Sequence, residues 1–158
     1  MTSAVIKFSA ILLLVAACVA DVVDLPSVKN AQPVTEVCLG CMCQAISGCK
    51  LGLQCEGETC GLFRITWAYW ADAGKPTING QSTDDPTAYK NCAVDPACAA
   101  QTVQGYMSRF GQDCNGDGVT DCYDYMMINH NGGHGCTTPL SRSASGRRQL
   151  QLFKQCKF

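Results

Sequence analysis

Twelve cysteines between Cys38 and Cys156 constrain this chain more than any other feature. The sequence has 13 cysteines in 158 residues, and the remaining one, Cys18, lies in an apolar N-terminal stretch. An even set of thiols in a short chain is typical of a disulfide framework formed in an oxidising compartment. Each bridge stabilises the fold by roughly 2 to 4 kcal/mol. Zinc binding is the alternative use, but the chain has 2 histidines and no pair of CxxC motifs at finger spacing.

The first 20 residues are expected to be a secretory signal peptide. Lys7 precedes an apolar run at 11–17, and Cys18-Val19-Ala20 supplies small residues before Asp21. The run is too short to span a membrane. A lipoprotein with Cys18 as the lipidated residue is the alternative, and the twelve-thiol domain favours secretion. We therefore expect an extracellular protein without a membrane span.

The charge of the mature chain bears on its partners. Removing residues 1–20 takes away Lys7 alone, so 12 − 1 = 11 basic residues face 13 acidic ones, a formal charge of −2. The chain lacks the strong positive field expected of a protein that binds nucleic acid or anionic bacterial surfaces by charge. Its length suits one domain, which we expect to be a monomer.

Residues 21–35 carry two prolines and no helical period, so we expect a loose leader before one domain at 36–158. Helical spacing of apolar residues and cysteines predicts a helix over 36–47, with Gly48 as its stop. The glycine-rich segment 49–60 predicts a tight loop or a small β-hairpin. Large apolar side chains in 61–72 are expected to pack in the core.

The second half of the chain predicts further helices. One helical region runs from Pro86 to about Phe110 and is interrupted near Asp95-Pro96, because proline suits the first turn of a new helix. Another helix is predicted over 122–129. Residues 137–148 are polar, so we expect them to be flexible and cleavable at Arg147-Arg148. A last element should be tied back by Cys156.

Several cysteine-anchored motifs occur in one order along the chain. They are the CxxCxC run at Cys38, Cys41 and Cys43, then Ser47-Gly48-Cys49, Cys60-Gly61-Leu62-Phe63-Arg64-Ile65, and His130-Asn131-Gly132-Gly133. With this set the chain resembles the invertebrate-type (destabilase) lysozymes over nearly all of 36–156. The resemblance implies an α+β, mostly helical, disulfide-rich lysozyme-like fold with a short β-hairpin and a cleft. It also implies hydrolysis of β-1,4 links in peptidoglycan and, in some members, isopeptidase activity.

The resemblance implies a cysteine pairing. A seventh pair common in the family matches Ala73 and Thr102, so both partners are missing together and no thiol is stranded. The six implied pairs are Cys38–Cys122, Cys41–Cys156, Cys43–Cys49, Cys55–Cys60, Cys92–Cys98 and Cys114–Cys136.

The catalytic positions of the family are altered here. Glycoside hydrolysis needs one protonated and one ionised carboxyl group. The resemblance places Ile46 where the family has its glutamic acid, and a hydrocarbon side chain cannot protonate the leaving group. The loop that carries the family aspartate is shortened, so only Glu56 and Glu58 could stand in. Loss of general acid assistance typically costs 10²–10⁴-fold in rate, so we expect catalysis to be weak or lost.

Other candidate site residues have two interpretations. In the isopeptidase set, Thr66 replaces the family lysine, while His130 is retained either as a remnant of that site or as a structural hydrogen-bonding group. Trp67 and Trp70 are candidates for stacking on a glycan, although both could equally be core residues.

The segment from Asp113 to Asp124 has the spacing of an EF-hand-type calcium loop, with glycine at the sixth position. An Asn-Gly-Asp-Gly surface turn is the alternative. No cofactor is required by the expected chemistry, and a structural calcium ion would be the one candidate. The oxygen ligands would come from Asp113, Asn115, Asp117, Val119, Asp121 and Asp124.

These features leave three hypotheses about function. The first is an active secreted lysozyme that cleaves peptidoglycan with Glu58 or Glu56 and a further, unidentified acid in the cleft. The second is a non-catalytic module of the same fold that binds glycan. The third is a structural or interaction domain that uses the disulfide scaffold alone, and no residue pattern favours it.

Overall fold

The structure is a computed structural model that describes residues 32–157. The expected signal peptide at 1–20 and the leader up to residue 31 lie outside the described residues. Val34, in the last part of that leader, is 1% exposed. Its backbone N–H and C=O groups both bond to the side-chain amide of Gln104, at 3.0 and 2.6 Å. The packed part of the chain therefore begins before Glu36.

The first described helix, α2, spans Glu36–Ser47, as the sequence predicts. Thr35 caps it by accepting a hydrogen bond from the Cys38 N–H at 3.1 Å, and Glu36 lies in the first turn, where its charge complements the helix dipole. Gly48 ends the helix with a φ of 71°, a left-handed conformation that favours glycine. The buried face of α2 carries three cysteines that form disulfides.

A small antiparallel hairpin follows, so of the two structures expected for this segment, a tight loop or a hairpin, the hairpin is confirmed. Strand β1 (Cys55–Glu56) pairs with β2 (Thr59–Cys60), and Gly57 and Glu58 form the turn. Gly57 has a φ of 61° at the first turn position, where two-residue hairpins often need glycine. Cys55 lies opposite Cys60 in the register and is bonded to it, so the hairpin is closed by its own disulfide.

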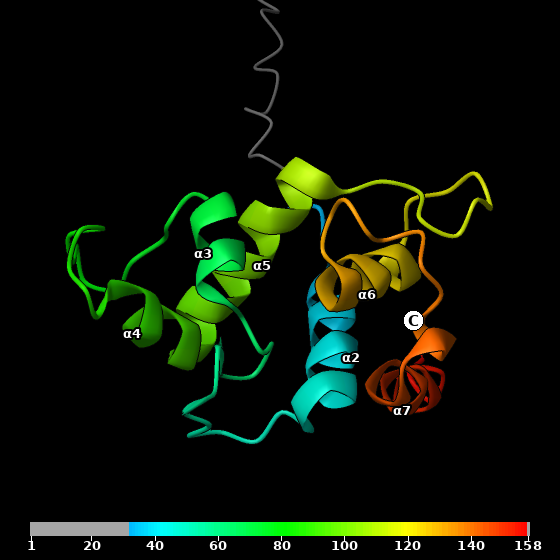
Figure 1. Cartoon of the computed structure of the whole chain (residues 1–158), viewed down its shortest axis with the longest axis horizontal. Helices are drawn as coiled ribbons and strands as arrows, with labels where there is room; N and C mark the ends of the chain where they lie inside the picture. Colours follow the sequence, from blue (N-terminus) through cyan, green and yellow to red (C-terminus); the bar gives the residue numbers. More distant parts are fainter. Residues whose placement is uncertain (1–31, 158) are drawn as a thin grey trace, which may run out of the picture. The chain divides into compact units, whose positions relative to one another are not determined.

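Three helices occupy the middle of the chain: α3 (Trp67–Asp72), α4 (Ala88–Val94) and α5 (Pro96–Phe110). The predicted break at Asp95-Pro96 is confirmed, because Asp95 ends α4 and caps α5 by accepting from the Cys98 N–H at 2.8 Å. Both α3 and α4 pack against the longer α5 (Figure 1).

The C-terminal part consists of α6 (Cys122–Asn131), a 3-10 helix η1 (Leu140–Arg142) and α7 (Ala144–Phe153). The expectation of a flexible stretch at 137–148 is wrong, because η1 and the first half of α7 lie there. Ser143 caps α7 by accepting from the Gly146 N–H at 2.9 Å. Arg147 donates to the Ser141 carbonyl at 2.9 Å, so this residue lies within an ordered helix.

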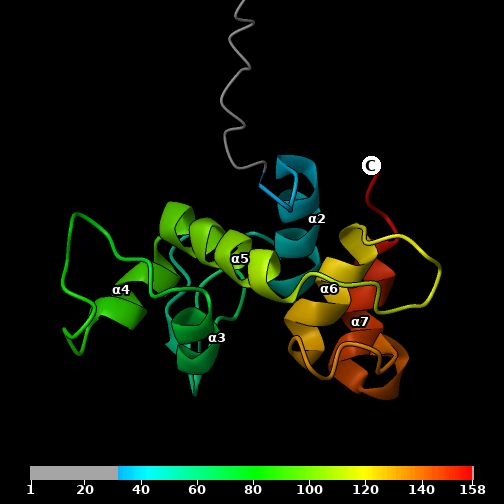
Figure 2. The same cartoon turned by 90° about the horizontal axis from the view of Figure 1, so that it is seen from above.

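Within residues 32–157 the elements form two groups around α5. Helix α2 packs against α7, and α6 contacts both α5 and η1, while α3 and α4 lie on the other side of α5 (Figures 1 and 2). The core between them is built from large apolar residues that include Met42, Ile65, Trp70, Met107 and Ile128, each at most 2% exposed. None of the helices described in this range is long and apolar enough to cross a membrane.

The structure contains the six disulfides that the resemblance implies. They differ in reach: Cys41–Cys156 joins residues 115 apart in sequence and ties the end of α7 to α2. Cys38–Cys122 spans 84 residues and ties the start of α6 to the same helix. Helix α2 is therefore the element to which the C-terminal part is anchored.

Candidate functional site

Ile46 lies near the end of α2, where the resemblance places the catalytic acid. Its side chain is half-buried and packs against the hydrophobic core. The next residue, Ser47, donates its hydroxyl to the Cys43 carbonyl at 3.3 Å, within the helix. This position therefore contributes hydrocarbon and no titratable group.

The two glutamates that could stand in for the family carboxylates lie on the hairpin and have different surroundings. Glu56, on β1, forms an exposed ion pair with Arg64, with 3.1 Å between the carboxylate oxygen and the guanidinium nitrogen. Glu58, in the turn, is also exposed, and its backbone carbonyl accepts from the Tyr89 hydroxyl at 3.1 Å. Only Glu58 lines the pocket that is described next.

A pocket of about 480 Å³ opens between the hairpin, the start of α3 and α4; we call it the Trp67 pocket. Sites for small molecules and sugars are typically concave, with apolar and aromatic walls and a few polar groups. This pocket has that composition. Its lining consists of Gly57, Glu58, Cys60, Thr66, Trp67, Ala68, Tyr89 and Lys90.

The two candidate tryptophans differ in exposure although they share one short helix. Trp67 is 58% exposed and lines the pocket. Trp70 is 2% exposed and donates its ring N–H to the Pro76 carbonyl at 2.7 Å. Trp70 is therefore a core residue with no free face for a glycan, and the expectation for it as a stacking residue is wrong.

Charged groups surround the aromatic face of the pocket. Partial burial, followed by the negative charge of Glu58, raises the pKa of Tyr89 above its ordinary value. The Tyr89 hydroxyl donates to the Ile65 carbonyl at 2.7 Å, so its ring is held in place. The Lys75 ammonium lies 6.0 Å from the centre of the Trp67 ring. The pocket thus combines an exposed aromatic ring with the Glu58 carboxylate and the Lys90 ammonium group, and the Lys75 ammonium lies nearby.

His130 has a structural setting in this molecule. Its Nδ1 lies 2.8 Å from the side-chain oxygen of Gln149, and its Nε2 lies 3.0 Å from the Ser143 hydroxyl. These bonds join α6 to the first and middle turns of α7. Thr66, at the position of the family lysine, caps α3 by accepting from the Tyr69 N–H at 3.2 Å. His130 thus joins α6 to α7, and Thr66 caps α3.

The loop expected to bind calcium is organised by backbone N–H donors. Asp113 accepts from the N–H groups of Gly116 and Gly118, at 2.7 and 2.8 Å. Asp124 is fully buried, and its two oxygens accept from three backbone N–H groups between Cys114 and Asp121. Among residues 32–157 no group of three or more acidic, His or Cys side chains could hold a metal ion. Calcium binding at this loop stays a prediction.

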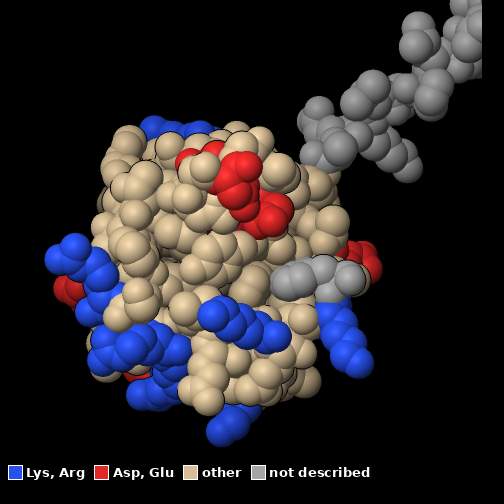
Figure 3. Space-filling view, turned by 90° about the vertical axis from the view of Figure 1, so that its right-hand side faces the viewer, with Lys and Arg blue, Asp and Glu red and all other residues tan. Residues whose placement is uncertain are grey.

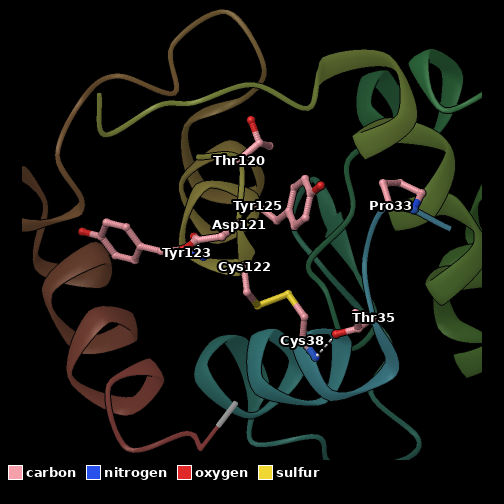
Figure 4. A pocket seen from close by; sticks show the side chains of 8 residues that line it. All are labelled: Pro33, Thr35, Cys38, Thr120, Asp121, Cys122, Tyr123 and Tyr125. Carbon is pink, nitrogen blue, oxygen red and sulfur yellow. Dashed lines mark hydrogen bonds between the residues drawn. A yellow bond between two sulfur atoms is a disulfide. The ribbon is translucent and has the colours of Figure 1, made fainter. Parts of the chain in front are cut away.

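A second pocket of about 400 Å³ lies between the start of α2 and the start of α6 (Figure 4). The Cys38–Cys122 disulfide forms its floor, and Tyr123 and Tyr125 project on either side. Partial burial, followed by the charges of Asp124 and Asp121, raises the pKa of Tyr125. Neither tryptophan nor either hairpin glutamate lines this pocket. It is therefore separate from the Trp67 pocket.

Comparisons with known proteins agree with this geometry. The destabilase family model matches residues 35–156. Invertebrate-type lysozyme 3 of Caenorhabditis elegans is 38% identical over 103 residues, which cover 63% of this chain and 73% of that protein. The invertebrate-type lysozyme of Ruditapes philippinarum is 30% identical over 128 residues, which cover 78% of this chain and 85% of that protein.

Two solved structures share the fold. The crystal structure of Tapes japonica lysozyme superposes with a TM-score of 0.57 at 29% identity, covering 78% of this chain and 94% of that chain. Meretrix lusoria lysozyme, in its complex with Aeromonas hydrophila PliI, gives a TM-score of 0.59 at 28% identity, covering 78% and 93%. With the family match, the helices and hairpin, and the six disulfides, the chain belongs to the destabilase family, the invertebrate-type lysozymes.

Proposed function

We propose that this protein acts outside the cell on bacterial peptidoglycan, and that it binds the glycan while cleaving it weakly or not at all. The target follows from the family, whose relatives carry the name lysozyme. A contrast within one fold supports the rest: Ile46 stands where the resemblance places the catalytic acid, while Trp67 stays 58% exposed in a pocket.

The reduced chemistry follows from the carboxylates. A glycosidase needs an acid to protonate the leaving oxygen and a second carboxylate to stabilise the positive charge that develops on the sugar. Glu58 is the one hairpin glutamate that lines the Trp67 pocket, because Glu56 is paired with Arg64 outside it. A single exposed carboxylate supplies one of the two roles. The rate should therefore fall by the 10²–10⁴-fold that general acid catalysis typically contributes.

Binding follows from the aromatic surface. An indole ring offers a flat apolar face against which the C–H face of a sugar can lie, with polar groups at its edge for the hydroxyls. Trp67 has such a face, and Glu58 and Lys90 lie in the same lining. Because Tyr89 is fixed by its hydroxyl bond to Ile65, the pocket is formed before a ligand enters.

An extracellular location is part of the proposal. Six disulfides are stable in an oxidising environment and rare in reducing ones. The apolar N-terminal run and the secreted character expected of this family point to the same compartment.

Calorimetric titration with soluble peptidoglycan fragments tests the proposal. The wild type should show saturable binding, and Trp67→Ala should weaken it at least tenfold, about 1.4 kcal/mol, because the stacking face is lost. The matched control is Leu51→Ala, which trims a side chain that is 80% exposed and outside the pocket; its affinity should equal that of the wild type. Equal affinities for wild type and Trp67→Ala would remove the basis of the proposal.

A further inference from the structure

The charges of this chain are distributed unevenly along the sequence. All 13 acidic residues lie at or before Asp124, so the last 34 residues, 125–158, contain none. The same segment carries five of the basic residues. We call their side chains the α7 basic face: Arg142, Arg147, Arg148, Lys154 and Lys157.

The five side chains of the α7 basic face are exposed and lack carboxylate partners within the described part of the chain. Every one of them is solvent-exposed. The two ion pairs found among residues 32–157 join Arg64 to Glu56 and Arg109 to Asp72, both outside this face. Figure 3 shows basic side chains spread over the lower half of one side of the molecule, with the largest acidic patch above them. A local positive field therefore exists on a protein whose expected mature charge is −2.

Helix α7 is anchored at several points, so the backbone positions of its basic residues are fixed. The Cys41–Cys156 disulfide ties its end to α2, and His130 bonds to both Ser143 and Gln149 along its length. A fixed backbone loses little entropy on binding, and this favours recognition of a repeating ligand.

The same anchoring limits what the face can bind. Amphipathic helices enter membranes by turning an apolar stripe toward the lipid. In α7 the apolar side faces inward: Phe153 is 4% exposed and Leu150 packs against the core, whereas Leu152 is 38% exposed. The exposed side thus offers charge and little hydrocarbon. This favours a polyanion in water over a bilayer.

We propose that the α7 basic face binds a phosphodiester-linked polymer of the bacterial wall and so retains the protein beside its glycan. The guanidinium groups of arginine match phosphate oxygens in a two-point geometry, and repeated phosphates along a polymer match repeated cations along a helix. The choice of a wall polymer rests on the proposed function; the binding of a phosphate polymer does not. The Trp67 pocket would then bind the glycan of the wall, and the α7 basic face would bind its phosphodiester-linked polymer.

Fluorescence anisotropy with labelled poly(glycerol phosphate) tests the inference at low salt. The double variant Arg148→Gln/Lys154→Gln removes two cations whose side chains form no hydrogen bond or ion pair within residues 32–157, and its affinity should fall at least tenfold. The control Arg64→Gln/Arg109→Gln removes the same charge from two exposed ion pairs elsewhere, and its affinity should change less than threefold. Circular dichroism verifies that both variants fold. Equal losses in the two variants, or no loss in either, would overturn the inference.

Sedimentation with bacterial walls separates this inference from the proposed function. On intact walls the Arg148→Gln/Lys154→Gln variant should bind at least tenfold less than the wild type. On walls stripped of phosphodiester polymers with hydrofluoric acid the two proteins should bind equally, and Trp67→Ala alone should lose binding. If Arg148→Gln/Lys154→Gln also loses binding to stripped walls, the proposed role of the α7 basic face is contradicted. If Trp67→Ala still binds stripped walls, the proposed glycan site at the Trp67 pocket is contradicted, and the inference about the α7 basic face is unaffected. Tighter binding of wild type to anionic phospholipid vesicles than to poly(glycerol phosphate) would overturn the choice of partner.

Discussion

The Trp67 pocket and the α7 basic face are two exposed surfaces of one protein that are built in opposite ways. The pocket gathers side chains from the hairpin, α3 and α4, and its hairpin is closed by a disulfide between residues 5 apart. The face draws its charges from one continuous segment, which a disulfide between residues 115 apart attaches to α2. Stacking in the pocket acts at contact distance, whereas the charges of the face act over about 8 Å at physiological salt. The difference predicts separate responses to mutation and to salt.

The largest predicted difference concerns the two disulfides. Loss of Cys41–Cys156, by Cys41→Ser/Cys156→Ser, should lower the free energy of unfolding by about 5 kcal/mol, because the loop that it closes is long. Loss of Cys55–Cys60, by the corresponding serine pair, should cost about 2 kcal/mol. Urea unfolding followed by circular dichroism measures both. Equal losses would mean that the two regions are not anchored in the way described.

Substitution of the buried tryptophan should affect stability, whereas substitution of the exposed one should affect binding. Trp70→Ala leaves a cavity in the core and should lower the free energy of unfolding by about 3 to 5 kcal/mol. Trp67→Ala removes an exposed ring and should change it by no more than about 0.5 kcal/mol. Thermal unfolding of both variants is the measurement. A large destabilisation by Trp67→Ala would show that its ring supports the fold and would weaken its role as a binding surface.

The two histidines provide a sharper comparison within the α7 region. His130→Ala removes two hydrogen bonds that join α6 to α7 and should cost about 1 to 3 kcal/mol. His134, which is exposed and meets Phe110 edge-on, provides the control, and His134→Ala should cost no more than about 0.5 kcal/mol. Chemical unfolding of the two variants is compared. Similar values for both would contradict the anchoring role of His130.

Salt should weaken binding at the α7 basic face much more than binding at the Trp67 pocket. Between 50 and 200 mM NaCl, binding of poly(glycerol phosphate) should weaken roughly tenfold or more, since each contact of a cation with a phosphate releases a counterion. Binding of uncharged glycan fragments at the Trp67 pocket should change less than about twofold over this range. Titrations at four salt concentrations give both slopes. Parallel slopes would mean that one surface binds both ligands.

The smallest predicted effect is a pH dependence at the loop between α5 and α6. The Gly118 N–H and, to a lesser degree, the Gly116 N–H lower the pKa of Asp113 below its ordinary value. A lowered pKa means that the ionised carboxylate stabilises the fold above the unfolded pKa of about 3.9, and that this is lost as the pH falls through the folded pKa. Asp113→Asn should therefore unfold with a shallower dependence on pH below about 4. Acid unfolding curves of wild type and variant that coincide would contradict this.

Local signals in the sequence predicted most of the fold. The helix at Glu36–Ser47 and the break at Asp95-Pro96 follow from spacing, caps and proline, which act within a few residues. The start of α7 could not be predicted in this way. Its first residues are polar and lack an apolar period, and its order depends on the Ser143 cap and on His130, which lies 13 residues before Ser143. The start of α7 therefore depends on tertiary contacts.

The candidate site was harder to predict than the fold. Trp67 and Trp70 are three residues apart and chemically equal, and the tertiary packing that buries Trp70, with Pro76 and Tyr89 among its neighbours, cannot be read from the local sequence. Tyr89 and Lys90 were missed altogether, because α4 joins the pocket through the tertiary fold and carries no motif. The α7 basic face was missed for another reason. Net charge averages over the chain and conceals a segment without acids.

Release of new reducing ends from purified peptidoglycan tests the central claim most directly. With the mature wild-type protein at a concentration that saturates binding, we predict release at, or only slightly above, the level of a protein-free blank. The variants Glu58→Gln and Glu56→Gln should give the same level. Strong release by the wild type that disappears in Glu58→Gln would show that this carboxylate works with an acid other than residue 46, and would contradict the claim that the fold binds glycan while cutting it weakly or not at all.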